Sequence, residues 1–201
     1  MALDLSSTGI VGVFDYNALT SRDIPNSVTE LYLPNNQITE IKNIPDSVRF
    51  LNLSNNQITE IKNIPESITY LYLSNNRITE IKNIPNSTTN LSLSCNQITE
   101  IKNIPDSVTV LYLSNNQITE IKNIPRSIDC LHLSNNQITH ISQHIPVTLD
   151  IHHNIPTIQK YTKQELSDFT RCYDIYDVLS TYKIHCTTNI IQQYLRIALP
   201  K

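Results

Sequence analysis

The sequence contains little glycine and few of the patterns that carry enzyme chemistry. Two glycines in 201 residues exclude a glycine-rich phosphate-binding loop. There is no C-x-x-C pair and no H-E-x-x-H motif, which are common signatures of redox and metal-dependent sites. We therefore predict no catalytic residues, no bound metal and no cofactor.

Long apolar runs and an excess of charge of one sign are also absent. No run could span a bilayer, and residues 1–23 lack the basic start and apolar core of a secretory signal. The net charge of −3 gives no basic bias toward nucleic acid or an anionic membrane. Four cysteines without a secretory signal suit a reducing compartment. We expect a protein of the cytoplasm, of its own cell or of a host, that binds neither nucleic acid nor membrane.

What the sequence does contain is a segment of twenty residues that recurs without a gap from Ile24 to Gln143. Self-similarity at a fixed period of this size indicates a solenoid. One copy buries too little apolar surface to fold alone, so the copies must stack as rungs around a shared core. The six copies begin at Ile24, Ile44, Ile64, Ile84, Ile104 and Ile124.

Within one copy the apolar positions follow two periods. Leu51 and Leu53 alternate with residues of the opposite side, which predicts a short strand with both leucines inward. Ile58 and Ile61 are three residues apart and lead toward Pro65, which predicts an extended, polyproline-like or 3₁₀ return segment. Each rung is therefore a strand, an asparagine-rich corner and an extended return.

A constant asparagine follows each strand at the corner. An inward amide can bond backbone groups that a tight corner would otherwise leave buried and unpaired. We predict a structural ladder of Asn36, Asn56, Asn76, Asn96, Asn116 and Asn136.

The pattern Val48-x-x-Leu51-x-Leu53-x-x-Asn56-x-Ile58 resembles the L-x-x-L-x-L-x-x-N-x-L segment of leucine-rich repeats. The short repeat and the proline after the return are similar to the repeats of bacterial effector proteins. The Ile-Pro-x-Ser-Val-Thr start resembles repeats of social amoebae and of giant DNA viruses of amoebae, although the Phe of their Phe-Asn-Ile-Pro signature is missing here. The resemblance implies a leucine-rich repeat solenoid, and an intracellular viral or effector protein, with a parallel β-sheet on a concave face used for binding.

The repeats cover residues 24–143, and the rest of the chain is assigned to their ends. Residues 1–23 are predicted to form an N-terminal capping rung, with Val11 and Val13 at the leucine positions and Tyr16 at the asparagine position.

After the repeats, residues 144–156 are predicted to form a degenerate seventh rung in which Asp150 lies beside His132. Residues 157–201 contain two helical patterns, one of which opens with a capping box from Thr162 to Glu165. We predict a C-terminal helical cap, with a separate interaction motif as the alternative.

The columns that differ between copies lie on the outward side of the predicted strands. The packing of rungs places few constraints on the side chains at these positions. Several of them are aromatic, and aromatic residues dominate protein interfaces. Drift at unconstrained positions is the alternative, with aromatics retained for their strand propensity. The predicted partner-binding residues are Glu30, Tyr32, Phe50, Asn52, Tyr70, Tyr72, Asn90, Ser92, Val110, Tyr112 and His132, with Cys130 in the same columns.

Two charged columns repeat in the return segments. Stacking places like charges about 4.8 Å apart, and the neighbouring column of opposite sign should offset their repulsion. We interpret them as a solvated outer wall, with partner binding as the alternative. The columns are Glu40, Glu60, Glu80, Glu100 and Glu120 beside Lys42, Lys62, Lys82, Lys102 and Lys122.

The copy that begins at Ile84 departs most from the others. Thr88 replaces a core valine or isoleucine, and Cys95 replaces the first corner asparagine. A buried hydroxyl without a partner costs about 1–3 kcal/mol. We predict that this rung is the least stable and that Thr88→Val raises the melting temperature.

These features favour a non-enzymatic module, monomeric or self-associating, that binds an unidentified protein partner. One alternative is a structural or self-associating repeat protein. Another is a truncated, effector-like, host-targeting protein of the ubiquitin-ligase-linked type without its catalytic domain. The tail after the repeats is too short to form such a domain.

Three weaker possibilities concern single side chains. His132 and His140, with His144, His152 and His153, could gather around a metal, but we interpret them as surface histidines. Ser134 lies near a predicted Asp150–His132 pair, which superficially suggests nucleophilic catalysis. An open face, however, offers no oxyanion hole. Cys172 and Cys186 could pair or remain thiols.

Overall fold

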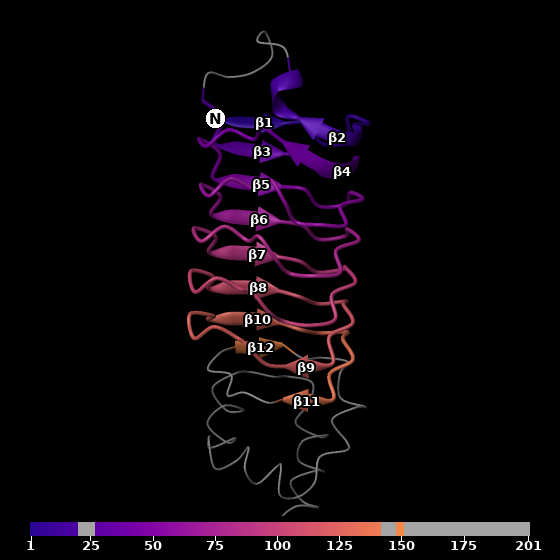
Figure 1. Cartoon of the computed structure of the whole chain (residues 1–201), viewed down its shortest axis with the longest axis vertical. Helices are drawn as coiled ribbons and strands as arrows, with labels where there is room; N and C mark the ends of the chain where they lie inside the picture. Colours follow the sequence, from indigo (N-terminus) through magenta and orange to yellow (C-terminus); the bar gives the residue numbers. More distant parts are fainter. Residues whose placement is uncertain (20–26, 142–147, 151–201) are drawn as a thin grey trace, which may run out of the picture. The chain divides into compact units, whose positions relative to one another are not determined.

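The computed structural model describes residues 1–19, 27–141 and 148–150, all within the unit Met1–Thr157. Short strands stack into one eight-stranded parallel sheet in the order of the chain (Figure 1). These strands are β1 (Ala2–Asp4), β3 (Glu30–Tyr32), β5 (Phe50–Asn52), β6 (Tyr70–Tyr72), β7 (Asn90–Ser92), β8 (Val110–Tyr112), β10 (Cys130–His132) and β12 (Thr148–Asp150). The predicted solenoid with a parallel sheet is confirmed.

Every strand places its inward leucine opposite the leucine of the next strand. Leu51, for example, lies in register with Leu31 on one side and Leu71 on the other. The leucines and the isoleucines of the return segments fill one continuous core, in which Leu51 is 0% exposed and Ile61 1%. The alternation of inward leucines with outward residues in the sequence therefore predicts the orientation of these strands correctly.

The return segments form the other side of each rung. In the described residues their regular structure is limited to β2 (Val11–Asp15) with β4 (Gln37–Lys42), β9 (Glu120–Ile121) with β11 (His140–Ile141), and the 3₁₀ helix η1 (Tyr16–Ala18). A proline turn then leads into the next strand, as where the Val48 N–H donates to the Pro45 carbonyl at 3.0 Å. The same turn occurs at Pro65, Pro85, Pro105 and Pro125. The twenty-residue period leaves no room for a helix of ordinary length between successive strands of the sheet.

The inward corner asparagines join neighbouring rungs. Nδ2 of Asn76 donates to the carbonyls of Leu53 (3.0 Å) and Leu73 (3.1 Å), and its Oδ1 accepts from the Ile58 N–H (2.9 Å). Each side chain therefore bonds the rung before it and its own. Equivalent bonds are made by Asn36, Asn56, Asn96, Asn116 and Asn136.

Two further asparagine columns adopt left-handed backbone, which the sequence analysis did not single out. Asparagine tolerates this region better than other non-glycine residues, so it takes a role that glycine fills elsewhere. Asn83 also donates from Nδ2 to the Ile61 carbonyl across rungs, at 2.9 Å. The columns are Asn35, Asn55, Asn75, Asn115 and Asn135, and Asn43, Asn63, Asn83, Asn103 and Asn123, with φ between 53° and 57°.

The N-terminal rung has a different register from the predicted one. Val11 and Val13 are 67% and 48% exposed and lie in β2, which pairs with the return strand β4. Leu3, not a valine, lies opposite Leu31. The prediction for Val11, Val13 and Tyr16 was wrong because Leu3 precedes Leu31 by 28 residues, whereas later leucines are 20 apart. Extending the twenty-residue period backwards from Leu31 therefore places the first inward position at residue 11, which is 8 residues after Leu3.

At the other end, β12 pairs with β10 in the predicted register. Leu149 lies opposite Leu131, and Asp150 lies opposite His132. The expected helical cap at 157–201 lies outside the described residues, as do Cys172 and Cys186. The segment boundaries stay predictions.

The copy that begins at Ile84 is strained at a different residue from the one predicted. Thr88 is 0% exposed, and its hydroxyl donates to the Ile68 carbonyl at 3.0 Å, so the assumption of an unpaired hydroxyl was wrong. Cys95, in contrast, has φ 56° at a corner where the other copies have asparagine. The cost in this rung therefore comes from the backbone at Cys95.

We expect Cys95→Asn to stabilise the protein by about 1 kcal/mol, since left-handed backbone costs most residues about 1–2 kcal/mol and asparagine less. Urea unfolding followed by circular dichroism measures the change. Cys95→Ala is the matched control, because it removes the thiol without adding tolerance for positive φ, and it should give no gain. Equal stability of the Asn and Ala variants would contradict this explanation.

Candidate functional site

The outward side chains of six neighbouring strands form one surface, which we call the sheet face. The strands bring all the predicted partner-binding residues together on it. Glu30 and Tyr70 are exposed, Ser92 is buried, and the others are half-buried. The sheet face comprises Glu30, Tyr32, Phe50, Asn52, Tyr70, Tyr72, Asn90, Ser92, Val110, Tyr112, Cys130 and His132. Whether these residues bind a partner stays a prediction.

An aromatic cluster lies on β3, β5 and β6. The ring of Phe50 is 4.9 Å from that of Tyr32, 5.2 Å from Tyr72 and 6.2 Å from Tyr70, measured between centroids. These separations are typical of favourable aromatic pairs. The rings therefore cover one another partly and form a continuous platform, of which Tyr70 is the most exposed member at 42%.

A second aromatic pair lies two strands farther along the sheet. Tyr112 on β8 and His132 on β10 stack with centroids 4.7 Å apart and ring planes 14° from parallel. The intervening strand β7 carries the small polar residues Asn90 and Ser92, and the Ser92 hydroxyl lies 2.6 Å from that of Ser74. The sheet face thus has two aromatic areas separated by an area of small polar side chains.

Formal charge is scarce on the sheet face, where Glu30 alone carries one. The Tyr32 hydroxyl donates to Glu30 at 3.1 Å. Burial, followed by this hydrogen bond, raises the pKa of Tyr32. Burial likewise raises the pKa of Tyr72. Both phenols therefore stay protonated at neutral pH and can donate hydrogen bonds.

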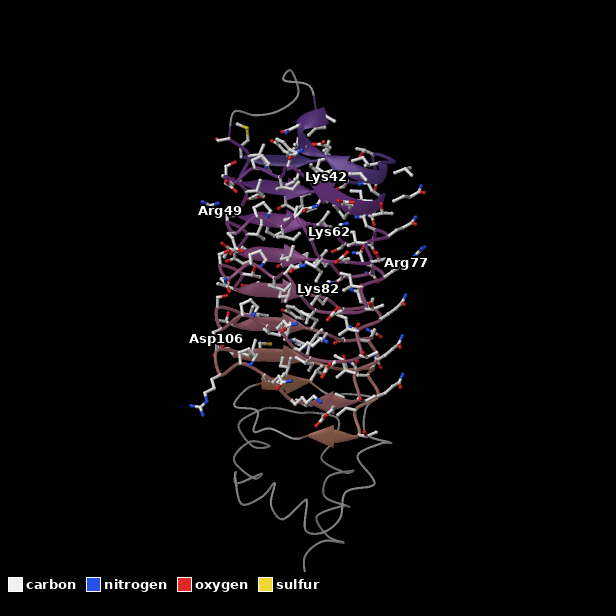
Figure 2. All side chains as sticks on the ribbon, in the orientation of Figure 1. Lys42, Arg49, Lys62, Arg77, Lys82 and Asp106 are labelled. Carbon is white, nitrogen blue, oxygen red and sulfur yellow. The ribbon has the colours of Figure 1, made fainter. Side chains whose placement is uncertain are left out.

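The charged side chains labelled in Figure 2 belong to the segments that connect the strands of the sheet, not to the outward strand positions. Figure 2 shows Lys42, Lys62 and Lys82 one below another, Arg49 and Asp106 at one lateral edge, and Arg77 at the other. The sheet face and the charged surfaces are consequently distinct.

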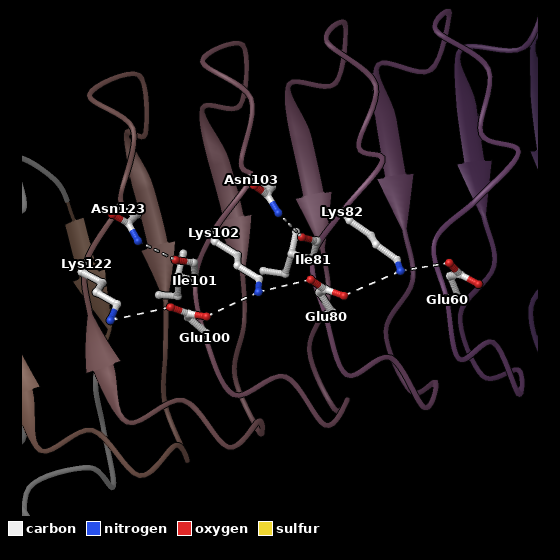
Figure 3. Close-up of polar contacts among 10 residues, drawn as sticks. All are labelled: Glu60, Glu80, Ile81, Lys82, Glu100, Ile101, Lys102, Asn103, Lys122 and Asn123. Carbon is white, nitrogen blue, oxygen red and sulfur yellow. Dashed lines mark hydrogen bonds and ion pairs between the residues drawn. The ribbon is translucent and has the colours of Figure 1, made fainter.

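The charged columns of the return segments form a ladder of ion pairs (Figure 3). Nζ of Lys82 lies 3.0 Å from Glu60 and 3.6 Å from Glu80, and Nζ of Lys102 lies 3.2 Å from Glu80 and 3.5 Å from Glu100. Hydrogen bonds from the lysines lower the pKa of Glu60 and Glu80, and the same bonds raise the pKa of both lysines. The pairs are solvent-exposed, so each contributes little alone. The ladder also includes Glu40, Lys42, Lys62, Glu120 and Lys122.

Two searches of the described residues gave negative results. Within 1–19, 27–141 and 148–150, no group of three or more His, Cys, Asp or Glu residues could hold a metal. In the same part of the chain, no helix is long and apolar enough to cross a bilayer. His144, His152 and His153, which belong to the alternative metal site, lie outside the described residues.

One contact on the sheet face was not predicted. Sγ of Cys130 lies 3.1 Å from Nε2 of His132. Residues two apart on a strand share a side, so the Cys-x-His spacing on a predicted strand was the available signal.

Three stretches of the chain, residues 14–56, 56–96 and 96–136, match the FNIP Repeat family. Together they cover more than half of the 201 residues. A search of curated proteins gave no match.

Solved structures with the same fold include leucine-rich effector proteins of bacteria. YopM from Yersinia enterocolitica WA-314 is 28% identical, with a TM-score of 0.57 over 64% of this chain and 29% of that one. YopM from Yersinia pestis, described as a leucine-rich effector protein, is 19% identical, with a TM-score of 0.57 over 76% and 49%. A Shigella effector LRR domain is 22% identical, with a TM-score of 0.50 over 63% and 64%.

This chain spans less than two thirds of the length of each of those chains. The similarity confirms the leucine-rich repeat solenoid, a fold whose extended surface suits an interaction module.

Proposed function

The chain belongs to the FNIP repeat family, and we propose that it is a non-enzymatic module that binds a partner protein on its sheet face. The observation that carries the proposal is a surface rich in aromatic rings and nearly free of formal charge. The centres of protein interfaces have this composition, with aromatic residues enriched and charged residues depleted. The aromatic cluster is the expected centre of contact.

Strand pairing does not require the aromatic rings. Asn90 and Ser92 occupy the same outward positions on β7, and that strand pairs in unbroken register with β6 and β8. Since small polar side chains suffice there, stacking alone does not explain the rings of Tyr70, Tyr72 and Tyr112. This supports a role in binding over retention for sheet stability.

The cluster is also preorganised. Phe50 packs against three tyrosines on adjacent strands, so few rotamers are left to lose when a partner binds. Hydroxyl groups on tyrosines around an apolar ring can bond the partner's backbone or polar side chains. We therefore expect recognition of a partner surface that is itself uncharged at its centre.

The double substitution Tyr70→Ala with Tyr72→Ala should weaken partner binding at least about tenfold, because truncating aromatic anchors at an interface costs about 2 kcal/mol or more. Partners captured by the immobilised chain from a lysate of its source or host cell are identified by mass spectrometry. The strongest is purified and titrated by calorimetry against the wild-type and variant chains.

The matched control is Thr79→Ala with Thr99→Ala, two exposed threonines of the return segments. It should retain wild-type affinity, and circular dichroism should show all chains folded. Equal affinity of the aromatic variant and the control would overturn the proposal. Light scattering against concentration tests the alternative of self-association, which requires a mass above that of the 23.0 kDa monomer.

A further inference from the structure

Cys130 and His132 lie side by side on β10 with their functional atoms in contact. The Sγ–Nε2 distance of 3.1 Å is within hydrogen-bonding range. The imidazole is held from the neighbouring strand β8, where the ring of Tyr112 stacks on it at 4.7 Å. Both side chains are half-buried on the sheet face.

A thiol paired with an oriented imidazole is the arrangement that activates cysteine as a nucleophile. We propose that Cys130 is a reactive thiol that undergoes thiol–disulfide exchange with low-molecular-weight disulfides such as oxidised glutathione, with His132 as its base. This inference goes beyond the proposed function and does not depend on it.

The reaction is balanced without any other oxidant. With its own proton on Nδ1, His132 accepts the Cys130 proton on Nε2, which leaves a thiolate and an imidazolium. The thiolate attacks one sulfur of the disulfide, so a new S–S bond forms to Cys130 and the original S–S bond breaks. The departing thiolate takes the proton from His132. Cys130 is thereby oxidised to a mixed disulfide, and one half of the small molecule is reduced to a thiol.

The strands on either side of β10 place two residues each in register with the pair. On β8 the facing residues are Val110 opposite Cys130 and Tyr112 opposite His132. On β12 they are Thr148 and Asp150, with Asp150 at the register position of His132. Asp129 immediately precedes the pair. No lysine or arginine occupies these positions.

Cys95 provides an internal comparison. It is also a half-buried thiol, at the corner after β7. In the part of the chain that the structure describes, no imidazole lies within hydrogen-bonding reach of its sulfur. Because Cys95 and Cys130 have similar exposure but different neighbours, a difference in reactivity reports on His132.

The test exposes the full-length chain to oxidised glutathione and quenches the reaction with acid and N-ethylmaleimide at set times. Trypsin cleaves after Lys82, Lys102 and Arg126, so the two thiols fall in separate peptides that mass spectrometry can quantify. At pH 7 Cys130 should form the mixed disulfide about tenfold faster than Cys95, since an ordinary thiol is only a few per cent ionised there.

Two further measurements separate activation from mere accessibility. His132→Gln should lower the rate at Cys130 to about that of Cys95 and leave Cys95 unchanged. Between pH 6 and 8 the rate at Cys130 should change much less with pH than the rate at Cys95.

Equal rates and parallel pH profiles at the two cysteines in the wild-type chain would overturn the proposal. An unchanged Cys130 rate in a folded His132→Gln chain would also overturn it. The wild-type pH profile decides by itself if that variant does not fold.

Discussion

Asn76→Ala is expected to lower the free energy of unfolding by about 3–5 kcal/mol, although it removes only a short polar side chain. The amide is 8% exposed and bonds the Leu53 and Leu73 carbonyls and the Ile58 N–H. Truncation leaves the Ile58 N–H buried without its acceptor, which costs about 1–3 kcal/mol. It also removes one of two amide donors from each carbonyl, since Asn56 still donates to Leu53 and Asn96 to Leu73, and each lost hydrogen bond costs about 0.5–1.5 kcal/mol. Since whole domains are stable by about 5–15 kcal/mol, the loss is a large part of the total.

Urea unfolding of Asn76→Ala, followed by circular dichroism, measures the effect. Gln97→Ala is the matched control, because it removes an exposed amide near the next corner and should change stability by less than about 0.5 kcal/mol. Asn76→Asp should be as damaging as alanine, since a carboxylate cannot donate to the two carbonyls. If Asn76→Ala lost no more stability than Gln97→Ala, the ladder would have no structural role.

The regular part of the fold could be predicted because each rung repeats the same physical problem. Leu51 and Leu53 alternate with outward residues, and the copies are identical in length, so one strand assignment fixed the register of the strands from β3 to β10. The same reasoning placed the outward residues on one face. The family resemblance added the expectation of a binding surface, which the sheet geometry alone does not demonstrate.

Departures from the repeat could not be predicted in the same way. Val11 and Val13 were assigned to the sheet because the frame was extended into a rung with a longer connection, where Leu3 is the true equivalent. Thr88 was expected to be unsatisfied because periodicity does not show that the Ile68 carbonyl lies within reach. Such contacts depend on the distance between rungs rather than on the residue pattern.

The left-handed asparagines show a signal that was present but not used. The two corner columns that include Asn75 and Asn83 are almost constant in a chain with two glycines. A turn of a solenoid needs positive φ at its corners, and asparagine is the next best residue where glycine is absent. The constant asparagines therefore predict left-handed backbone in the columns of Asn75 and Asn83, and an inward amide in the column of Asn76.

Leu71→Ala is expected to lower the free energy of unfolding by about 2–5 kcal/mol, as for other fully buried leucines. Leu71 is 0% exposed and lies in register between Leu51 and Leu91. In a solenoid, stability is approximately a sum over rungs and the interfaces between neighbours. A cavity at Leu71 weakens the interfaces on both sides of β6, so hydrogen exchange should increase there in the rungs before and after it.

Leu3→Ala is the comparison that tests this reasoning, because Leu3 is half-buried and lies opposite Leu31 at the start of the sheet. It should cost less than half as much as Leu71→Ala in urea unfolding, since one described interface is affected rather than two and less apolar surface is lost. A loss at Leu3 equal to that at Leu71 would contradict the expectation that the cost follows the apolar surface and the number of interfaces lost. The nearest-neighbour description would then fail for this chain, and with it the expectation that damage at one rung is confined to its neighbours.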